Sequence, residues 1–430
     1  AILSLILRSL SKGGLATALF LALFFSYGRF YELLEIWDVF VPAHAHLLPA
    51  VLLAFGCCVY FIDRVKSPVA TTTSVLNIMA VALIAINLFN IGFYQFREAV
   101  SVPTQPAGSQ QVTTARISPE AFKTTPDIYL IILDEYAHPD TMKEWYDYDN
   151  SKFIKSLEDK GFFVAYNSKT STGLTQRSIA SLLNMGYVDE TEDSGLFRKN
   201  ADNKVVNFLK AKGYFYVCYG THYVFGGEKV DADLYYDFWN RIGGRTPQYE
   251  FVRFLCNSTM VRPFRNHFNE IMGETFYRSI TINTLAHLEK KIVGVPGPKF
   301  VFAYILPPHE PFVFGPNGER IASVNWSNYK DKQFYLGQYM FVSDAIQRVV
   351  DAILQNSVNA PIIIIQSDHG LRSGHPGIEV REDEWHKILN AYYLPSGDKE
   401  LLYDSISPVN SFRLIFNHYL GADYDLLEDD

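Results

Sequence analysis

Two long apolar runs, each ending in acidic residues, constrain the fold of this chain most strongly. The first, over 128–135, reads Ile-Tyr-Leu-Ile-Ile-Leu-Asp-Glu, and the second, over 361–370, reads Pro-Ile-Ile-Ile-Ile-Gln-Ser-Asp-His-Gly. Such runs predict strands that are buried on both faces, as in a parallel α/β sheet. Because functional groups collect at the carboxyl ends of parallel strands, we expect Asp134, Asp368 and His369 to meet at one edge of the sheet.

These three side chains offer ligands that suit a divalent cation. Carboxylate oxygens and imidazole nitrogens are the groups that hold hard and borderline divalent ions in proteins. Glu135 follows Asp134 directly, and its side chain should point the opposite way if the strand continues. Asp134 is therefore the better ligand, and the role of Glu135 is left open.

Composition limits the classes of partner. The chain has 430 residues, a net charge of −8, and Phe, Tyr and Trp at 15% of its length. An acidic chain of this kind does not predict a nucleic-acid surface, and its aromatic content is common near membranes and sugars. The four cysteines form no metal-binding spacing, although a disulfide between Cys218 and Cys256 is left open.

The first hundred residues carry three apolar runs, Gly13–Gly28, Ala45–Ile62 and Val75–Tyr94. The last two are long enough to cross a hydrocarbon core of about 30 Å, and the first is borderline. Basic residues precede the first run and follow the second, whereas acidic residues dominate the connection between them. By the positive-inside bias, three spans place everything after Tyr94 on the extracytoplasmic side of the cell membrane. We therefore expect a multi-pass protein whose first partner is the lipid bilayer.

Two histidines lie at the outer end of the second run. His44 and His46 could contact a lipid phosphate or a metal ion, or could simply begin a helix in the headgroup region.

The domain organisation follows from these patterns. Residues 1–99 are expected to form about three transmembrane helices, 100–126 a polar linker, and 127–430 an extracytoplasmic α/β domain. Strands and helices alternate in that last part, which predicts a mainly parallel sheet with helices on both faces. The expected strands are 127–133, 162–166, 214–219, 299–305 and 361–366, and the expected helices are 150–160, 204–212, 280–292 and 335–354.

The hydroxyl-rich stretch 167–184 becomes helical near Thr175. A hydroxyl at a helix N-terminus is well placed to attack phosphorus, because the backbone N–H groups and the helix dipole stabilise an anion there. The same pattern also fits ordinary N-capping by Ser or Thr.

Three further histidines are candidates for binding substrate. His309 lies in Pro-Pro-His-Glu-Pro-Phe, a stiff loop after an expected strand, where it could contact a substrate oxygen. His375 and His386 follow the Asp-His pair closely and could complete a second metal site or bind phosphate. A plain surface role is open for each of the three.

Taken in order, these segments resemble the alkaline phosphatase and sulfatase superfamily. An acidic residue ending the first strand, a Thr before a helix, a His-x-Pro-Phe loop and a late Asp-His-Gly form that family's skeleton, and the match extends over about 127–395. The apolar runs and the linker resemble its membrane-anchored branch, which includes lipoteichoic acid synthases and lipid A phosphoethanolamine transferases. The resemblance implies an alkaline-phosphatase-like sheet.

The resemblance also implies roles for single residues. Asp134, Asp368 and His369 would be metal ligands, Thr175 the catalytic nucleophile, and His309 a substrate-binding residue. Thr170 and Thr172 are alternatives for the nucleophile, since a slip of one or two positions is conceivable in this stretch.

The chain departs from the family pattern in two ways. It has no Cys-x-Pro-x-Arg, so formylglycine chemistry is not expected. The His that follows Asp-His-Gly by about a dozen residues in the phosphoethanolamine branch has no counterpart, and Arg381 stands near that place. Either His375 or His386 substitutes for it, or the site holds a single metal ion. One or two ions of Mn, Mg, Zn or Ca remain open.

The first hypothesis is thus a membrane-anchored, metal-dependent phosphotransferase or phosphodiesterase that uses a Thr nucleophile on a phospholipid headgroup or a similar donor, with a glycan hydroxyl or water as acceptor. A sulfatase-like hydrolase of sulfuric or phosphoric esters is the alternative within the same enzyme class. From a different class, the chain could be a catalytically silent membrane protein that keeps the fold as a binding module.

Overall fold

A computed structural model describes residues 2–36, 44–65, 125–189, 195–236, 254–321, 332–372 and 379–429. The chain divides into two compact units: Ala1–Pro106 with Arg245–Asn269, and Ala107–Gly244 with Glu270–Asp430. The predicted domain boundaries remain a prediction. We describe each unit by itself.

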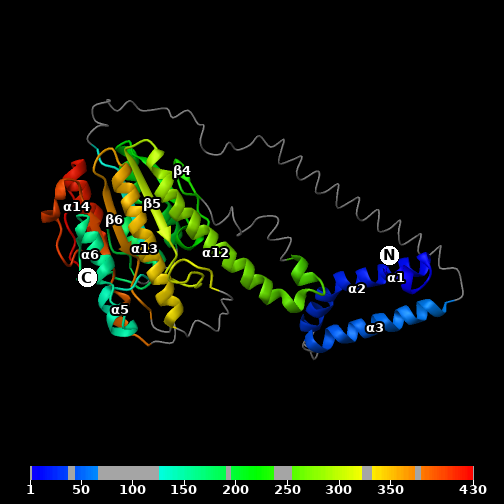
Figure 1. Cartoon of the computed structure of the whole chain (residues 1–430). Helices are drawn as coiled ribbons and strands as arrows, with labels where there is room; N and C mark the ends of the chain where they lie inside the picture. Colours follow the sequence, from blue (N-terminus) through cyan, green and yellow to red (C-terminus); the bar gives the residue numbers. More distant parts are fainter. Residues whose placement is uncertain are drawn as a thin grey trace. The chain divides into compact units, whose positions relative to one another are not determined.

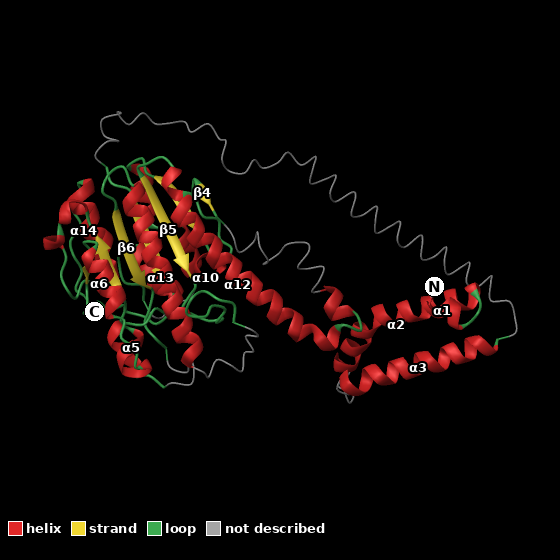
Figure 2. Ribbon diagram, viewed as in Figure 1, coloured by secondary structure: helices red, strands yellow, loops and turns green. Residues whose placement is uncertain are grey.

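The second unit is built on one seven-stranded sheet with the order β2-β7-β6-β1-β5-β3-β4. Strands β6, β5 and β4 of this sheet are labelled in Figures 1 and 2. Strands β1, β5, β6, β3 and β4 pair in parallel, and β7 pairs antiparallel with both β6 and β2. The predicted mainly parallel sheet is therefore confirmed. The strands are β1 (Ile128–Leu133), β2 (Phe163–Val164), β3 (Phe215–Tyr219), β4 (Leu234–Tyr235), β5 (Lys299–Ile305), β6 (Ile362–Ser367) and β7 (Asn390–Tyr393).

Helices cover both faces of this sheet. Their bounds are α5 (Pro139–Tyr146), α6 (Ser151–Asp159), α7 (Thr175–Leu183), α8 (Leu196–Ala201), α9 (Lys204–Ala211), α10 (His222–Phe225), α12 (Arg265–Lys290), α13 (Lys332–Asn356) and α14 (Pro408–Leu420). Residues of α5, α6 and α13 pack on one face, and residues of α7, α9 and α14 pack on the other.

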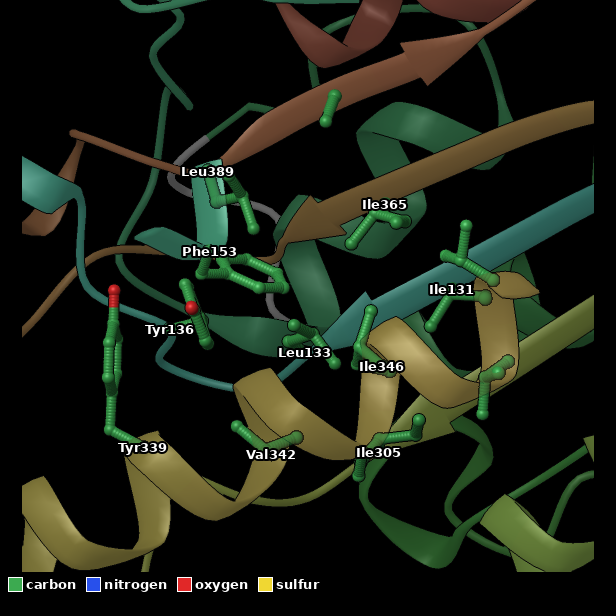
Figure 3. Packing of buried hydrophobic residues seen from close by; sticks show 14 of the residues in the cluster. Ile131, Leu133, Tyr136, Phe153, Ile305, Tyr339, Val342, Ile346, Ile365 and Leu389 are labelled. Carbon is green, nitrogen blue, oxygen red and sulfur yellow. The ribbon is translucent and has the colours of Figure 1, made fainter. Parts of the chain in front are cut away.

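Alternation along the strands divides the core into these two layers. Leu133 of β1, Ile305 of β5 and Ile365 of β6 face the layer of α13, where Val342 and Ile346 meet them (Figure 3). The intervening strand residues face the layer of α7. Because β1 is buried on both faces over its whole length, it needs apolar residues at every position, which explains the continuous run that stands out in the sequence.

The predicted helix ends agree well where glycine terminates a helix. Gly161 and Gly213 follow α6 and α9 with φ of 99° and 85°, a left-handed conformation that favours glycine. The predicted helix 280–292 is part of the longer α12, whose apolar residues do not gather along one face, so periodicity could not place its start. Cys218 and Cys256 are both buried and neither is in a disulfide, so the disulfide that the sequence left open is not formed.

The first unit contains α1 (Ile2–Ile6), α2 (Leu10–Ile36) and α3 (His44–Arg64). By length and composition, Leu10–Leu34 and His44–Arg64 are candidate membrane spans, which corresponds to the first two apolar runs. The third predicted span, 75–94, lies outside the described residues.

Residues 254–264 pack against α2 within this unit. The backbone N–H of Met260 donates to the Phe24 carbonyl at 3.0 Å, and a Cβ built on Gly28 would lie only 2.0 Å from the carbonyl oxygen of Asn257. The buried guanidinium of Arg262 pairs with Glu32 at 3.0 Å. We call these residues the 254–264 segment.

Near the same end of α2, the hydroxyl of Tyr27 lies 3.0 Å from Nδ1 of His44, and the Tyr31 ring packs on the imidazole. His46 is exposed.

Candidate metal centre

The carboxyl ends of two adjacent strands, β1 and β6, bring the predicted ligands together. Leu133 pairs with Ser367 in the register of β1 and β6, so the residues that follow, Asp134 and Asp368, emerge side by side. His369 comes next in the chain. The ligand atoms of these three residues all lie within 4.8 Å of one another, and all three side chains are buried. We call them the Asp–Asp–His group.

Hydrogen bonds orient the ligands of this group. Nδ1 of His369 lies 2.8 Å from the Gly370 carbonyl, which can only accept, so Nδ1 carries the proton and Nε2 presents its lone pair. Nε2 lies 3.6 Å from Oδ1 of Asp134 and 3.6 Å from Oδ2 of Asp368.

The remaining carboxylate oxygens are held from behind. Oδ1 of Asp368 accepts from the backbone N–H of Glu135 at 3.0 Å and of His369 at 2.8 Å, and Oδ2 of Asp134 accepts from the hydroxyl of Tyr304. The two oxygens that face Nε2 are buried and accept no hydrogen bond within the described part of the chain. Buried oxygens of this kind are costly unless a cation or donor meets them. The donor set therefore fits a divalent ion.

The electrostatics agree with that fit. Burial raises the pKa of Asp134 well above its usual value, and the carboxylate of Asp368 raises it further, although His309 acts in the opposite direction. Two buried carboxylates side by side repel each other in their charged forms, and a bound divalent ion offsets that repulsion.

Thr175 lies next to this group as the first residue of α7. Its Oγ1 is 3.4 Å from Nε2 of His369. Ser178, one turn later, donates from Oγ to the Asp368 carbonyl at 2.5 Å, which fixes the start of the helix against the end of β6. The structure therefore places Thr175, and not a neighbouring threonine, beside the ligands.

The two alternative threonines are engaged elsewhere. Oγ1 of Thr172 accepts from the backbone of Leu174, and the hydroxyl of Thr170 lies 3.3 Å from that of Ser178. His386 holds this same loop, because its Nδ1 donates to the Thr170 carbonyl at 2.6 Å. His386 does not belong to the Asp–Asp–His group, and His375 lies outside the described residues.

His309 lies beside the group rather than in it. Its backbone N–H donates to the Asp134 carbonyl at 3.2 Å, and Gln338 of α13 holds its loop by donating to the His309 carbonyl at 2.8 Å. Nδ1 of His309 contacts the Glu310 carbonyl at 2.7 Å, and Nε2 contacts the guanidinium of Arg372 at 2.8 Å.

The protonation state of His309 is set by opposing effects. Burial lowers its pKa, but the carboxylates of Asp134, Glu135 and Glu310 outweigh burial and raise the pKa to about 9. The observed partners of its two nitrogens decide between these states. Nδ1 must donate to a carbonyl and Nε2 must accept from a guanidinium, so the ring is neutral as long as Arg372 stays in place. Protonation of His309 would therefore displace Arg372.

Sequence reasoning left three residues of this region without a role. Glu135 leaves the strand with φ of 55° and is fully buried, so its side chain does not follow strand alternation. Arg372 contacts it through the backbone N–H at 2.9 Å. Tyr304 faces the same layer as Asp134, and the alternation of Phe300, Phe302 and Tyr304 along β5 was a signal that could have found it.

Among known proteins, only solved structures show a likeness to this chain. No protein-family model and no curated protein matches the sequence. The structure matches the C-terminal periplasmic domain of EcEptC from Escherichia coli, solved in complex with Zn, at 12% identity and a TM-score of 0.45, covering 70% of this chain and 84% of that one.

Two further matches are with BT1596, a 2-O GAG sulfatase, and with Ps i-CgsB in complex with k-i-k-neocarrahexaose. The first has 13% identity, a TM-score of 0.40 and coverage of 70% and 72%, and the second has 13% identity, a TM-score of 0.43 and coverage of 70% and 73%. With TM-scores below 0.5 these matches support no conclusion about fold or activity, and the proposals below rest on the residues of this chain.

Proposed function

We propose that the chain is a membrane-anchored, metal-dependent phosphotransferase or phosphodiesterase in which Thr175 is the nucleophile. The observation that supports this most is the position of the Thr175 hydroxyl, 3.4 Å from the one imidazole nitrogen of His369 that is turned toward the two carboxylates. A hydroxyl so close to a cation-binding group is the arrangement that turns a weak nucleophile into a usable one.

Asp134, Asp368 and His369 would hold the ion, with Thr175 at its side. When bound, a divalent ion supplies charge that lowers the pKa of a hydroxyl and offsets the negative charge of phosphoryl oxygens. The carboxylates suit Mg, Ca and Mn, and the imidazole suits Zn, so the set itself leaves these metals open.

The start of α7 contributes a second source of positive potential. The backbone N–H groups of Thr175 and Gln176 donate to no acceptor within the described residues. They are the first-turn donors that a helix leaves without intrahelical partners, and they lie at the positive end of its dipole. Phosphoryl oxygens held there would be stabilised as charge develops during attack by Thr175.

Arg372 supplies donors on the other side of the group. Its side chain is 28% exposed, so it can reach substrate, while its contact with His309 fixes its direction. The planar guanidinium matches two oxygens of a phosphodiester at once.

The candidate membrane spans favour a lipid-derived donor. A catalytic unit that is anchored to the bilayer has a much higher effective concentration at lipid headgroups than a soluble domain has. We propose that the unit lies outside the cytoplasm and that it transfers a headgroup-like phosphoryl group to a glycan hydroxyl or to water. Attack by the Thr175 oxygen on phosphorus would break the P–O bond to the lipid glycerol, which would leave as an alcohol carrying the proton that Thr175 gives up. The acceptor hydroxyl or water would then attack the same phosphorus, break the bond to Thr175 and return a proton to it.

The test is mass spectrometry of the full-length chain after incubation with vesicles of mixed phospholipids. We expect an added headgroup mass on the peptide that contains Thr175, no such mass in Thr175→Ala, and a fall in turnover of that variant by about a thousandfold or more. Thr172→Ala, which removes the nearest alternative hydroxyl, should still form the adduct.

Three results would contradict the proposal. An adduct that persists in Thr175→Ala would place the nucleophile elsewhere. Release of sulfate from a model ester, undiminished in Thr175→Ala, would favour the hydrolase alternative. A folded chain that takes up no Mn²⁺ or Zn²⁺ would favour the catalytically silent one.

A further inference from the structure

A second set of possible ligands lies beside the Asp–Asp–His group. Glu135, His309 and Glu310 bring their ligand atoms within 4.8 Å of one another. Nε2 of His309 is 3.9 Å from Oε2 of Glu135, and Nδ1 is 3.6 Å from Oε2 of Glu310. We call these residues the Glu–His–Glu group. By residue type alone, they could hold a second divalent ion.

Arg372 already lies within this second group. A guanidinium nitrogen is 2.8 Å from Nε2 of His309, and its Nε is 3.6 Å from Oε1 of Glu135. The backbone N–H of Arg372 donates to the same Glu135 oxygen at 2.9 Å. Arginine remains charged at any pH at which proteins fold, so this cation is permanent.

We propose that the guanidinium of Arg372 is the resident cation of the Glu–His–Glu group and that it excludes a second metal ion. The chain then binds one divalent ion, at the Asp–Asp–His group. This inference rests on the proposed function, since it specifies the metal content of the same site.

The hydrogen bonds of His309 support the proposal. Its Nδ1 faces the Glu310 carbonyl at 2.7 Å and must donate to it, which leaves Nε2 as the one ring nitrogen with a lone pair. Arg372 occupies that lone pair. A metal ion could bind there only after the guanidinium had moved away.

The net charges of the two groups also favour a metal ion at the Asp–Asp–His group and not at the Glu–His–Glu group. The Asp–Asp–His group carries two carboxylates and a neutral imidazole, and no arginine or lysine pairs with either carboxylate in the described part of the chain. The Glu–His–Glu group also carries two carboxylates, but Arg372 neutralises one of them. A divalent ion balances the first group, whereas it would leave the second with excess positive charge once Arg372 is counted.

The backbone holds Glu135 in place for Arg372. Its N–H donates to Oδ1 of Asp368 at 3.0 Å, and its carbonyl accepts from the hydroxyl of Tyr335 at 2.7 Å. These contacts fix the left-handed conformation at φ of 55°, which a non-glycine residue adopts only when its surroundings demand it. Because Arg372 follows His369 by three residues, the loop that carries the metal ligands also carries the competing cation.

The experiment is a count of metal ions per full-length chain. Purified protein is loaded with excess Zn²⁺ or Mn²⁺, freed of unbound ion, and measured by elemental mass spectrometry. We expect one ion in the wild type and two in Arg372→Met, which keeps an unbranched apolar side chain but removes the guanidinium and its charge. Glu135→Gln combined with Arg372→Met should return the count to one.

Matched variants separate charge from folding. Arg372→Lys should stay at one ion, and Arg372→Gln, a second uncharged variant, should bind two. Arg381→Met is the control, because Arg381 is an exposed arginine whose side chain pairs with Glu144 on the surface, and it should stay at one.

Two ions in the wild type would overturn the inference, as would an equal number of ions in wild type, Arg372→Met and Arg372→Gln. These outcomes are distinct from failure of the proposed function. One ion in the wild type and two in the uncharged Arg372 variants would support the inference. Full turnover in Thr175→Ala, measured alongside, would at the same time reject Thr175 as the nucleophile.

Discussion

At the scale of single residues, the orientation of Asp134 depends on Tyr304. The Tyr304 hydroxyl donates to Oδ2 of Asp134, which leaves Oδ1 facing Nε2 of His369. It also contacts Thr175, and burial together with the charges of Asp134 and Asp368 raises the pKa of this phenol well above its usual value. Tyr304 therefore stays protonated and acts as a donor that orients the carboxylate of Asp134.

We predict that Tyr304→Phe weakens divalent-ion binding by about 10- to 100-fold, as the loss of a hydrogen bond behind a metal ligand commonly does. Isothermal titration of the full-length chain with Mn²⁺ or Zn²⁺ measures this. Tyr216→Phe is the matched control, since it removes a fully buried phenol of β3 that faces the same layer. Equal affinities in the two variants would show that the Tyr304 hydroxyl does not position Asp134.

The sequence predicted the residues whose place follows from strand direction. Asp134, Asp368 and His369 come directly after buried strands, and parallel strands deliver their ends to one edge. Glu135 and Arg372 could not be placed in this way, because their positions depend on a left-handed turn and on a loop contact between segments more than 200 residues apart. Local sequence carries no signal for either.

At the scale of elements, the sequence predicted five strands, including the two-residue β2 within 162–166, and missed β4 and β7. The predicted strand 299–305 coincides with β5, but β4 has two residues, too few to show any pattern. The antiparallel β7, with the sequence Asn-Ala-Tyr-Tyr, was also missed, since its first residue is a buried asparagine that hydrogen bonds to Ser168.

The N-cap residue of α5, His138, makes the stability of the fold depend on pH. His138 is the N-cap of this helix, and its Nδ1 accepts from the backbone N–H of Asp140 at 3.2 Å, which requires a neutral ring. Burial lowers the pKa of His138, although the charge of Asp140 opposes this. The folded chain thus holds the ring neutral at a pH at which the unfolded chain already binds a proton.

We predict that His138 contributes to stability fully above its unfolded pKa of about 6.5, and that this contribution is lost as the pH falls below that value. His138→Asn keeps a capping acceptor without a titrating group. Melting temperatures of the full-length chain between about pH 8 and pH 5 should therefore fall less in His138→Asn than in the wild type. A variant at the exposed His418 should behave as the wild type does, and parallel curves for His138→Asn and wild type would contradict the prediction.

At the scale of the whole molecule, the first unit takes in a segment from far along the chain. The 254–264 segment lies in the range that the sequence assigns to the extracytoplasmic domain, yet it packs on α2 through Gly28 and Arg262. Nothing in the apolar runs predicts this, because hydropathy identifies spans and not what packs against them. The absence of a side chain at Gly28 is what permits the contact.

We predict that Gly28→Ala destabilises this unit by about 1–3 kcal/mol, since the added Cβ would overlap the Asn257 carbonyl and force the backbone apart. Gly56→Ala is the matched control, because a Cβ built on Gly56 of α3 meets nothing within 4 Å. Hydrogen exchange of the 254–264 segment in the full-length chain should accelerate in Gly28→Ala alone. Unchanged exchange in that variant would contradict the close contact.

The central claim is that Asp134, Asp368, His369 and Thr175, which come from three separate stretches of the chain, surround a single divalent ion. Anomalous diffraction from crystals loaded with Mn²⁺ or Zn²⁺ tests it most directly. The account predicts one strong peak at about 2.0–2.6 Å from Oδ1 of Asp134, Oδ2 of Asp368, Nε2 of His369 and Oγ1 of Thr175. A peak away from these atoms, or no peak in a folded and loaded chain, would contradict it.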